Sequence, residues 1–228
     1  YLEPAKELPV REEVDVLVVG AGPAGIMAAQ AAALVKGTKV MLIDSRGYLG
    51  GNMTIGLPLL GFLGRKGNEI IKGLPLRFVE RLRERGQATH HRKCPLHVSL
   101  TMVDPEGTEH LAWEIMEECG VEVLLYVFAT DVIMEGNKCK GVIIDSKKGR
   151  EVILAKTIVD CTGDGDILYR AGAGFSVAIP HKERLATLHA ICLQISLQSL
   201  FRIFSHASCV HIFRDISGKY SKIHKGFS

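Results

Sequence analysis

The chain has 228 residues, with 28 Lys and Arg against 25 Asp and Glu, so its net charge is only +3. This near balance argues against a nucleic-acid-binding protein, and a hydrophobic content of 47% argues against a disordered or fibrous chain. The sequence has no run of about 18 apolar residues and no basic, apolar leader, so we expect a cytoplasmic protein without a membrane partner. Six cysteines without close spacing indicate reduced thiols.

After a polar lead-in over residues 1–13, residues 14–44 have the pattern of strand, helix and strand. Residues 14–19 are apolar and mostly β-branched, as in a buried parallel strand. Helix-forming residues run from Ala24 to a glycine at position 37, and residues 39–44 are a second apolar run. The sequence therefore predicts a right-handed βαβ unit in an α/β, Rossmann-like fold with a parallel sheet.

Residues 20–25 read GAGPAG and fit the pattern G-x-G-x-x-G between the first strand and the helix. The first glycine permits a tight turn, the second lets the backbone approach a pyrophosphate, and the third lets helix and strand pack closely. At the end of the second strand, the carboxylate of Asp44 is placed to accept hydrogen bonds from ribose hydroxyls. Together these features predict a dinucleotide site. Its expected contacts are Gly20, Gly22, Pro23, Ala24, Gly25, Asp44, Ser45 and Arg46.

The middle of the chain is less regular. Residues 54–105 are predicted to be an insertion, with a helix over 69–85 and a loop over 90–97, and another helix is predicted to begin at residues 104–106. Glycine-containing turns then separate short apolar runs. These runs predict a β-meander that feeds a last buried strand, with strands over 121–127, 131–134, 141–145, 152–154 and 157–161.

Residues 162–166 read TGDGD and directly follow the last predicted strand. With residues 15–25, Asp44, the glycines at 50 and 51 and the meander, they make the sequence resemble the FAD-dependent oxidoreductases of the two-dinucleotide-binding type. More narrowly, it resembles the family related to fumarate reductase flavoproteins, over residues 3–174. The resemblance implies an FAD cofactor, held noncovalently because residues 51–54 offer no histidine for covalent attachment.

The resemblance also implies roles for single residues. The acid matching Asp164 binds the ribityl chain of FAD in that family, and the residue matching Ala129 contacts the adenine through its backbone. Independently of the family, the N–H groups at the start of residues 166–171 predict a helix N-terminus aimed at flavin N1 and O2. The cofactor contacts expected at this end are Gly50, Gly51, Asn52, Ala129, Thr162, Gly163 and Asp164.

Residues 90–97 bring three histidines and a cysteine close together in the sequence. The spacing does not suit zinc, and the neighbouring Arg92 and Lys93 repel a cation, so no metal site is expected. The resemblance makes His91 and His97 candidates for the substrate side. A solvated loop without a function is the competing interpretation.

Beyond about residue 174 the sequence no longer resembles the family. Glycine becomes rare over residues 176–228, where five of the nine histidines lie, and helical stretches are expected over 183–204. We interpret this tail as unmatched, with the substrate-capping domain incomplete or missing. A divergent cap, a truncated cap and a disturbed reading frame are the alternatives. Residues 14–175 are then the FAD-binding domain.

The first functional hypothesis is an FAD-binding oxidoreductase that transfers a hydride between a small organic substrate and flavin N5. Its catalytic acid or base is not identified by the sequence, and neither is its oligomeric state. Two alternatives remain open: an incomplete FAD-binding module without turnover, and a single-domain NAD-dependent oxidoreductase.

Overall fold

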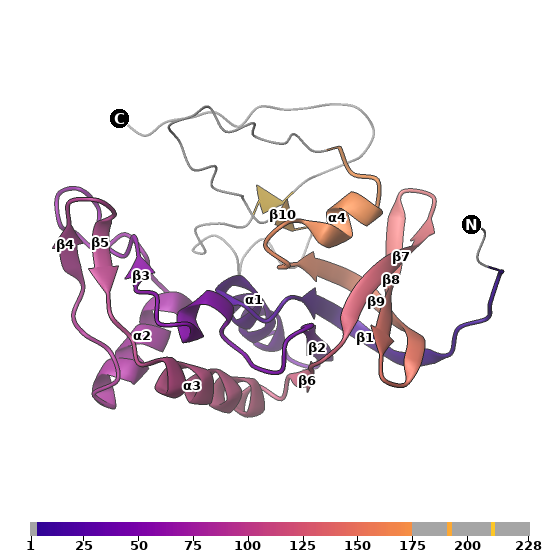
Figure 1. The fold of residues 1–228 in the computed structure, drawn as a ribbon, viewed down its shortest axis with the longest axis horizontal. Coiled ribbons are helices and arrows are strands. Elements are labelled where there is room, and N and C mark those ends of the chain that lie inside the picture. The colour runs from indigo at the N-terminus through magenta and orange to yellow at the C-terminus, as the bar shows by residue number, and fades with distance from the viewer. Residues whose placement is uncertain (1–3, 175–190, 193–210, 213–228) are drawn as a thin grey trace.

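The computed structural model describes residues 4–174, 191–192 and 211–212, and a six-stranded sheet lies at its centre (Figure 1). In spatial order the strands are β6 (Glu122–Leu124), β2 (Val40–Ile43), β1 (Val10–Val19), β9 (Gly149–Asp160), β8 (Lys138–Ser146) and β7 (Phe128–Glu135). The first four are parallel to one another, and β8 and β7 continue the sheet as antiparallel strands. The predicted α/β fold with a parallel sheet and a meander is confirmed.

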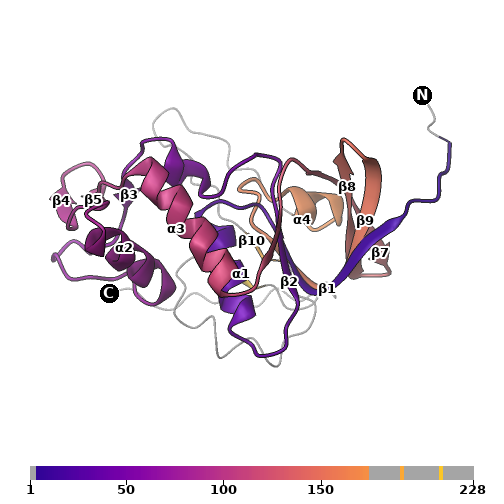
Figure 2. The same cartoon turned by 90° about the horizontal axis from the view of Figure 1, so that it is seen from below.

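Both faces of β1 are buried over residues 16–19, which explains the apolar run at the end of this strand. On one face, Val16 and Val18 belong to the core formed with α1 (Pro23–Ala33) and α3 (Pro105–Glu118). On the other face, Leu17 and Val19 pack with the meander and with α4 (Asp166–Arg170). Figure 2 shows α1 and α3 on one side of the strands and α4 on the other.

Several strand boundaries differ from the sequence predictions. The predicted strands 152–154 and 157–161 are one strand, β9, because its ladder with β1 continues through the residues between them. The predicted meander strand over 121–127 is wrong, since β6 is short and pairs in parallel with β2. β1 begins at Val10 rather than at residue 14. In this added first part of the strand the residues are mostly polar, and Arg11 forms an ion pair with Glu151 of β9 at 2.9 Å.

The insertion contains more structure than the sequence suggests. Leu59–Leu60 (β3), Val98–Thr101 (β5) and Arg92–Cys94 (β4) form a three-stranded antiparallel sheet, so the loop predicted over 90–97 is wrong and is a β-hairpin instead. α2 spans Leu74–Glu84, five residues shorter at its start than predicted. Gly73, at φ +69°, precedes it, and a proline lies in its first turn, where proline favours a helix start.

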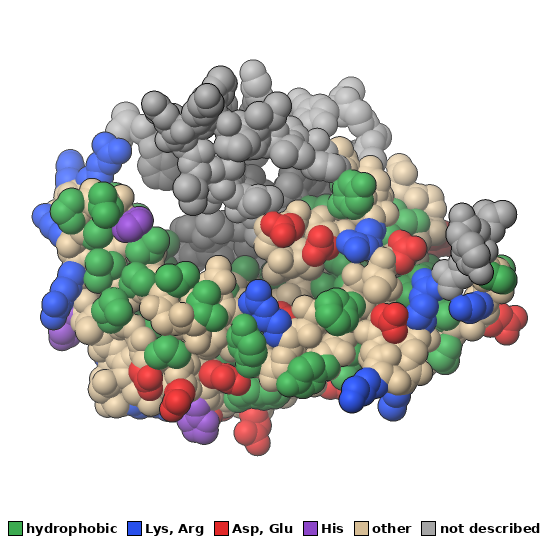
Figure 3. All heavy atoms as spheres, in the orientation of Figure 1, with side chains coloured by type: hydrophobic (Ala, Val, Ile, Leu, Met, Phe, Trp, Pro, Cys, Tyr) green, Lys and Arg blue, Asp and Glu red, His purple; other side chains and the backbone are tan. Residues whose placement is uncertain are grey.

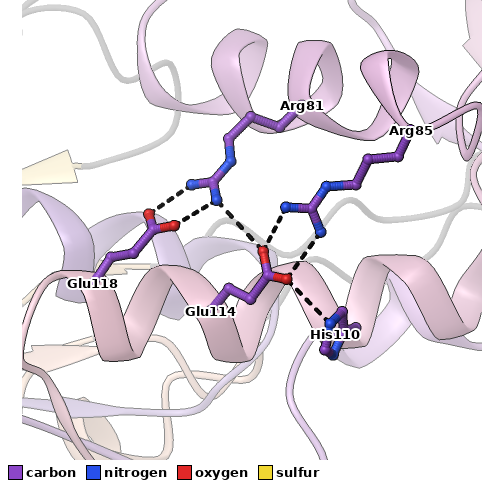
Figure 4. Close-up of polar contacts among 5 residues, drawn as sticks. All are labelled: Arg81, Arg85, His110, Glu114 and Glu118. Atoms are coloured by element: carbon purple, nitrogen blue, oxygen red, sulfur yellow. Dashed lines mark hydrogen bonds and ion pairs between the residues drawn. The ribbon is translucent and has the colours of Figure 1, made fainter.

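An ionic network fixes α2 to α3 (Figure 4). Arg81 donates to both carboxylate oxygens of Glu118 at 2.6 and 2.7 Å, and Arg85 donates to both oxygens of Glu114 at 2.5 and 3.1 Å. His110 Nε2 lies 3.1 Å from Glu114. Because α3 also contacts α1 and the 3₁₀ turn η1 (Gly51–Thr54), this network anchors the insertion to the elements around the glycine-rich turn.

The C-terminal prediction lies mostly outside the described residues. Within the predicted helical stretch 183–204, Ile191–Cys192 form a short strand, β10, which pairs in parallel with His211–Ile212, β11, so at these two residues the helix prediction is wrong. In the described part of the chain, none of the helices has both the length and the apolar character that a membrane span needs.

Candidate dinucleotide-binding site

The three glycines of the β1–α1 turn meet three different surroundings. A Cβ on Gly20, which has φ +101°, would collide with the carbonyl of Cys161, and a Cβ on Gly25 would collide with the carbonyl of Gly20. A Cβ on Gly22 would have no atom of the described residues within 4 Å. Two of the glycines are therefore required by the packing of the chain itself, whereas Gly22 borders open space, as the approach of a ligand requires.

The N-terminus of α1 is open. No side chain in the described part of the chain caps it, its first turn holds no acidic residue, and Pro23 has no N–H to satisfy. The N–H of Ile26 donates to the Gly22 carbonyl at 3.1 Å, while those of Ala24 and Gly25 have no partner among the described residues. Unpaired N–H groups and the positive end of an 11-residue helix therefore favour an anion here.

Asp44 follows β2 and lies directly against the turn. One carboxylate oxygen accepts from the N–H of Ala21 at 2.6 Å, and the other accepts from the N–H of Arg46 at 2.7 Å. Each oxygen keeps a further lone pair for a hydroxyl donor. Ser45 is exposed beside it, and the guanidinium of Arg46 lies over the Tyr48 ring, 5.9 Å from its centroid.

The glycine pair at 50 and 51 packs on the same turn. Gly50, at φ +104°, donates its N–H to the carbonyl of Ala21 at 2.9 Å, and a Cβ on Gly51 would lie 2.9 Å from the Cα of Gly22. Asn52 is exposed in η1. The structure thus brings the predicted glycine pair and the predicted pyrophosphate turn into contact, although about 25 residues separate them.

The second loop, between β9 and α4, is organised by a carboxylate that sequence reasoning missed. Asp160 ends β9 and is 1% exposed. One of its oxygens accepts from the N–H and the hydroxyl of Thr162 at 3.0 and 2.7 Å, and the other accepts from the N–H groups of Ile167 and Leu168 at 2.9 and 3.0 Å. An acid at the end of an apolar strand, as at Asp44, was the available signal.

The hydroxyl of Thr162 completes this arrangement by accepting from the N–H groups of Gly165 and Asp166 at 3.1 and 2.9 Å. The N–H groups at the start of α4 are therefore satisfied within the chain. The expectation that this end offers free N–H groups to flavin N1 and O2 is wrong for the described structure, because Asp160 and Thr162 already bind them.

Gly163 and Asp164 form the exposed tip of the second loop. The Asp164 carboxylate has no hydrogen-bond or ion-pair partner among the described residues, and Gly163 has φ +91° with open space around it. The base of the loop touches the first turn, since the N–H of Cys161 donates to the Val19 carbonyl at 2.8 Å. The two loops predicted to bind one cofactor are thus neighbours.

The entry to β7 is tied to the turn that follows β2. Val127 donates its N–H to the Asp44 carbonyl at 3.1 Å, and Tyr126, at φ +58°, donates to the Arg46 carbonyl at 3.2 Å. Ala129 follows in β7, half-buried and packed toward the core. Beside it lies a surface hollow of about 600 Å³. It is lined by Ser45, Tyr126, Phe128, Thr130, Asp145, Ser146 and Lys147.

The two substrate-side candidates lie on the insertion. His91 stacks on Phe62 with ring centroids 4.4 Å apart, its Nδ1 lies 2.5 Å from Thr101 Oγ1, and its Nε2 is buried without a partner in the described chain. Burial, followed by the charge of a nearby arginine, lowers the pKa of His91, which favours the neutral form of its ring. The Nδ1 of His97, which is exposed, lies 3.7 Å from Cys94 Sγ.

These contacts all stay within the insertion, so the structure does not bring either histidine to the dinucleotide site, and a substrate-side role remains a prediction. Around the three-stranded sheet, hydrophobic and basic side chains share the surface (Figure 3). The exposed hydrophobic residues of the insertion are Ile55, Leu57, Leu60, Ile70, Leu96, Val98 and Met102. In the described part of the chain, no three His, Cys, Asp or Glu side chains are grouped so as to hold a metal ion.

Residues 15–210 match the family described as FAD dependent oxidoreductase. The chain belongs to this family. It is an FAD-dependent oxidoreductase by family, and FAD is its cofactor. The match continues past residue 174, where the sequence resemblance was expected to end, and so includes part of the tail. No similar sequence was found among curated proteins.

Solved structures share the fold. A geranylgeranyl bacteriochlorophyll reductase-like protein from Thermoplasma acidophilum is 25% identical, with a TM-score of 0.51 over 71% of this chain and 42% of that protein. A flavocytochrome c3 fumarate reductase in its open conformation is 21% identical, with a TM-score of 0.52 over 68% of this chain and 34% of that one. The anhydrotetracycline hydroxylase OxyS from Streptomyces rimosus is 19% identical, with a TM-score of 0.55 over 74% of this chain and 36% of that one. The chain therefore spans less than half of each of these proteins.

Proposed function

We propose that this chain holds FAD noncovalently across its two adjacent loops, and that the complete protein transfers a hydride between a small organic substrate and flavin N5. The observation that carries the proposal is the β1–α1 turn. Its helix N-terminus is uncapped and Gly22 borders open space, although Gly20 and Gly25 on either side are tightly packed. A turn of purely structural use does not need this open side.

The adenosine half of FAD is proposed to run from this turn toward β7. Asp44 would accept from the ribose hydroxyls, since it already lies against the turn and keeps free lone pairs. The hollow beside Ser45 supports a place for the adenine, because Tyr126 and Phe128 are 72% and 61% exposed there and offer aromatic faces to a planar base. Ala129 would contact the base through its backbone.

The ribityl and flavin half is proposed to run the other way, past the glycine pair and the second loop. The exposed carboxylate of Asp164 would accept hydrogen bonds from ribityl hydroxyls, with Thr162 and Gly163 shaping the loop. Gly50, Gly51 and Asn52 would lie near the flavin. The contacts of the glycine pair with Gly22 support one continuous site.

When bound, FAD supplies the hydride chemistry, and the chain contributes binding, orientation and charge. Among the described residues we assign no catalytic acid or base. The proposed partner is a small-molecule substrate, the oligomeric state is left open, and the proposed compartment is the cytoplasm.

A second candidate is an FAD holder that turns nothing over. The comparison that raises it is one of length, since the chain spans only 34 to 42% of the three structural neighbours.

An absorption spectrum of the purified protein tests both candidates. We expect flavin bands, with the flavin released into solution when the protein is unfolded, because the binding is noncovalent. A colourless protein that FAD does not reconstitute contradicts the proposal. If organic donors bleach the bands without oxygen and an acceptor restores them, the chain is an enzyme. Bands that no donor bleaches, but that dithionite does, identify the holder.

A further inference from the structure

Asp160 is a buried carboxylate that has no cationic partner in the described chain. Burying a charged carboxylate costs free energy unless hydrogen bonds satisfy it, and four donors from three residues do so here. An apolar side chain would fill the same space without this cost. The arrangement therefore holds a particular conformation of the β9–α4 loop, beyond filling the core.

The β9–α4 loop needs hydrogen bonds to fix its conformation because it is rich in glycine. Gly163 and Gly165 have φ values of +91° and +75°, and glycine loses more conformational freedom on ordering than any other residue. Thr162 stands between them and Asp160. Its N–H and hydroxyl donate to Asp160, and its hydroxyl oxygen accepts from the N–H groups of Gly165 and Asp166. Both ends of the tip are thereby fixed to one buried side chain.

We propose that Asp160 is a positioning residue that, through Thr162, fixes the loop tip so that Asp164 meets the ribityl–flavin half of FAD. The inference rests on the proposed function, because it takes the loop tip as a cofactor contact. It adds that the two loops contact different halves of the cofactor. The β1–α1 turn and Asp44 hold the ADP half, whereas the Asp160–Thr162 pair orders only the contacts to the other half.

These separate roles predict that a change at Asp160 or Thr162 weakens the binding of FAD but not that of ADP. A general destabilisation of the fold would weaken the binding of both nucleotides. In an Asp160→Asn variant the amide group has a single acceptor oxygen, so its NH₂ must face one of the two pairs of donors. A Thr162→Val variant loses both hydroxyl functions. Each variant should bind FAD at least about tenfold more weakly, the effect of losing a hydrogen bond to a charged group. ADP, which does not reach the second loop, should bind as it does to the wild type.

The test measures the dissociation constants of FAD and ADP by titration calorimetry on the wild type and both variants. Thr162→Ser keeps the hydroxyl and should restore FAD binding. Asp131→Asn makes the same chemical change at an exposed acid, whose carboxylate accepts from the next N–H along the chain, and should change neither constant. If Asp160→Asn does not fold, the Val and Ser variants of Thr162 decide the question.

An unchanged ratio of FAD to ADP affinity in both variants overturns the role of Asp160, whether the two constants stay the same or weaken together. A wild-type protein that binds neither nucleotide overturns the proposed function instead. The two failures are therefore distinguishable in one set of titrations.

Discussion

The turn after β1 and the loop after β9 leave neighbouring parallel strands at the same edge of the sheet, and each leads into a helix, but they treat the helix N-terminus in opposite ways. At α1 no side chain caps the N-terminus, and the N–H groups of Ala24 and Gly25 have no partner among the described residues. At α4 the N–H groups are satisfied by Thr162 and Asp160. A glycine-rich loop before a helix is therefore insufficient evidence for an anion site.

The contrast assigns different physical roles to glycines that look alike in the sequence. In the first turn, Gly20 and Gly25 are needed by the packing of the chain, whereas Gly22 has no described atom beside it and is free for the ligand contact that we propose. In the second loop, the glycines shape an exposed tip. The carboxylate of Asp164 at this tip accepts no hydrogen bond from the described residues. One loop offers donors to phosphate and the other offers an acceptor to hydroxyls, which suits two ends of one cofactor.

The largest effect is expected from Gly25→Ala. The added Cβ meets the backbone carbonyl of Gly20, which has no flexible side chain to move, so helix and strand must separate. We expect a loss of about 3 kcal/mol or more in the free energy of unfolding, typical of overpacking in a core. Thermal denaturation of the apoprotein measures it. A melting temperature equal to that of the wild type would show that the turn is looser than described.

Gly22→Val should separate binding from stability. The position has extended backbone angles that any residue adopts, and its surroundings are open, so the apoprotein should melt within a few degrees of the wild type. FAD affinity should fall about a hundredfold or more, because the side chain occupies the approach of the pyrophosphate. Titration of FAD onto the variant checks this, and full retention of FAD would rule out the assigned role of the turn.

Asp44→Asn should weaken FAD binding by about tenfold, since hydrogen bonds to a charged group are worth more than those to a neutral amide. Asp131→Asn serves as the matched control. Comparison of FAD with a 2′-deoxyadenosine analogue sharpens the result. If Asp44 binds the ribose, the wild type should prefer FAD and the variant should lose most of this preference; a preference that survives the substitution argues against the ribose contact.

The smallest effect is expected at the ionic network far from the loops. Hydrogen bonding to Arg81 lowers the carboxyl pKa of Glu118, so its stabilisation is present at neutral pH and is lost as the pH falls below about 4.3, the ordinary value for glutamate. Because the pair is partly exposed, Arg81→Met should cost about 1 kcal/mol or less at pH 7. The cost should become smaller at pH 3 than at pH 7 in chemical denaturation. An equal cost at both pH values would point to packing of the side chain instead.

The first turn was predictable because its signals are local. Strand, glycines, helix and Asp44 follow one another within 35 residues, and each residue type has a physical reason to be there. Asp104 and the proline after it likewise predicted the start of α3, where Asp104 accepts from the N–H of Gly107 at 3.1 Å.

The parts that were missed depend on contacts that no local pattern expresses. The role of Asp160 arises from the direction of one side chain, which reaches N–H groups seven and eight residues later. In the hairpin, β4 is mostly polar, and the alternation of β5 is inverted, because its polar residues Ser99 and Thr101 are buried whereas Val98 is exposed. The predicted strand over 121–127 contains β6, but its parallel pairing with β2 was missed, because three residues carry no pattern that identifies the neighbouring strand.

Amide hydrogen exchange, resolved by residue and measured with and without FAD, tests the central contrast most directly. We predict that FAD slows exchange at Ala24 and Gly25, whose N–H groups lack partners among the described residues. Ile167 and Leu168 should already be protected without FAD, because Asp160 binds their N–H groups. Exchange that FAD slows at Ile167 and Leu168 but not at Ala24 and Gly25 would contradict this difference between the two loops.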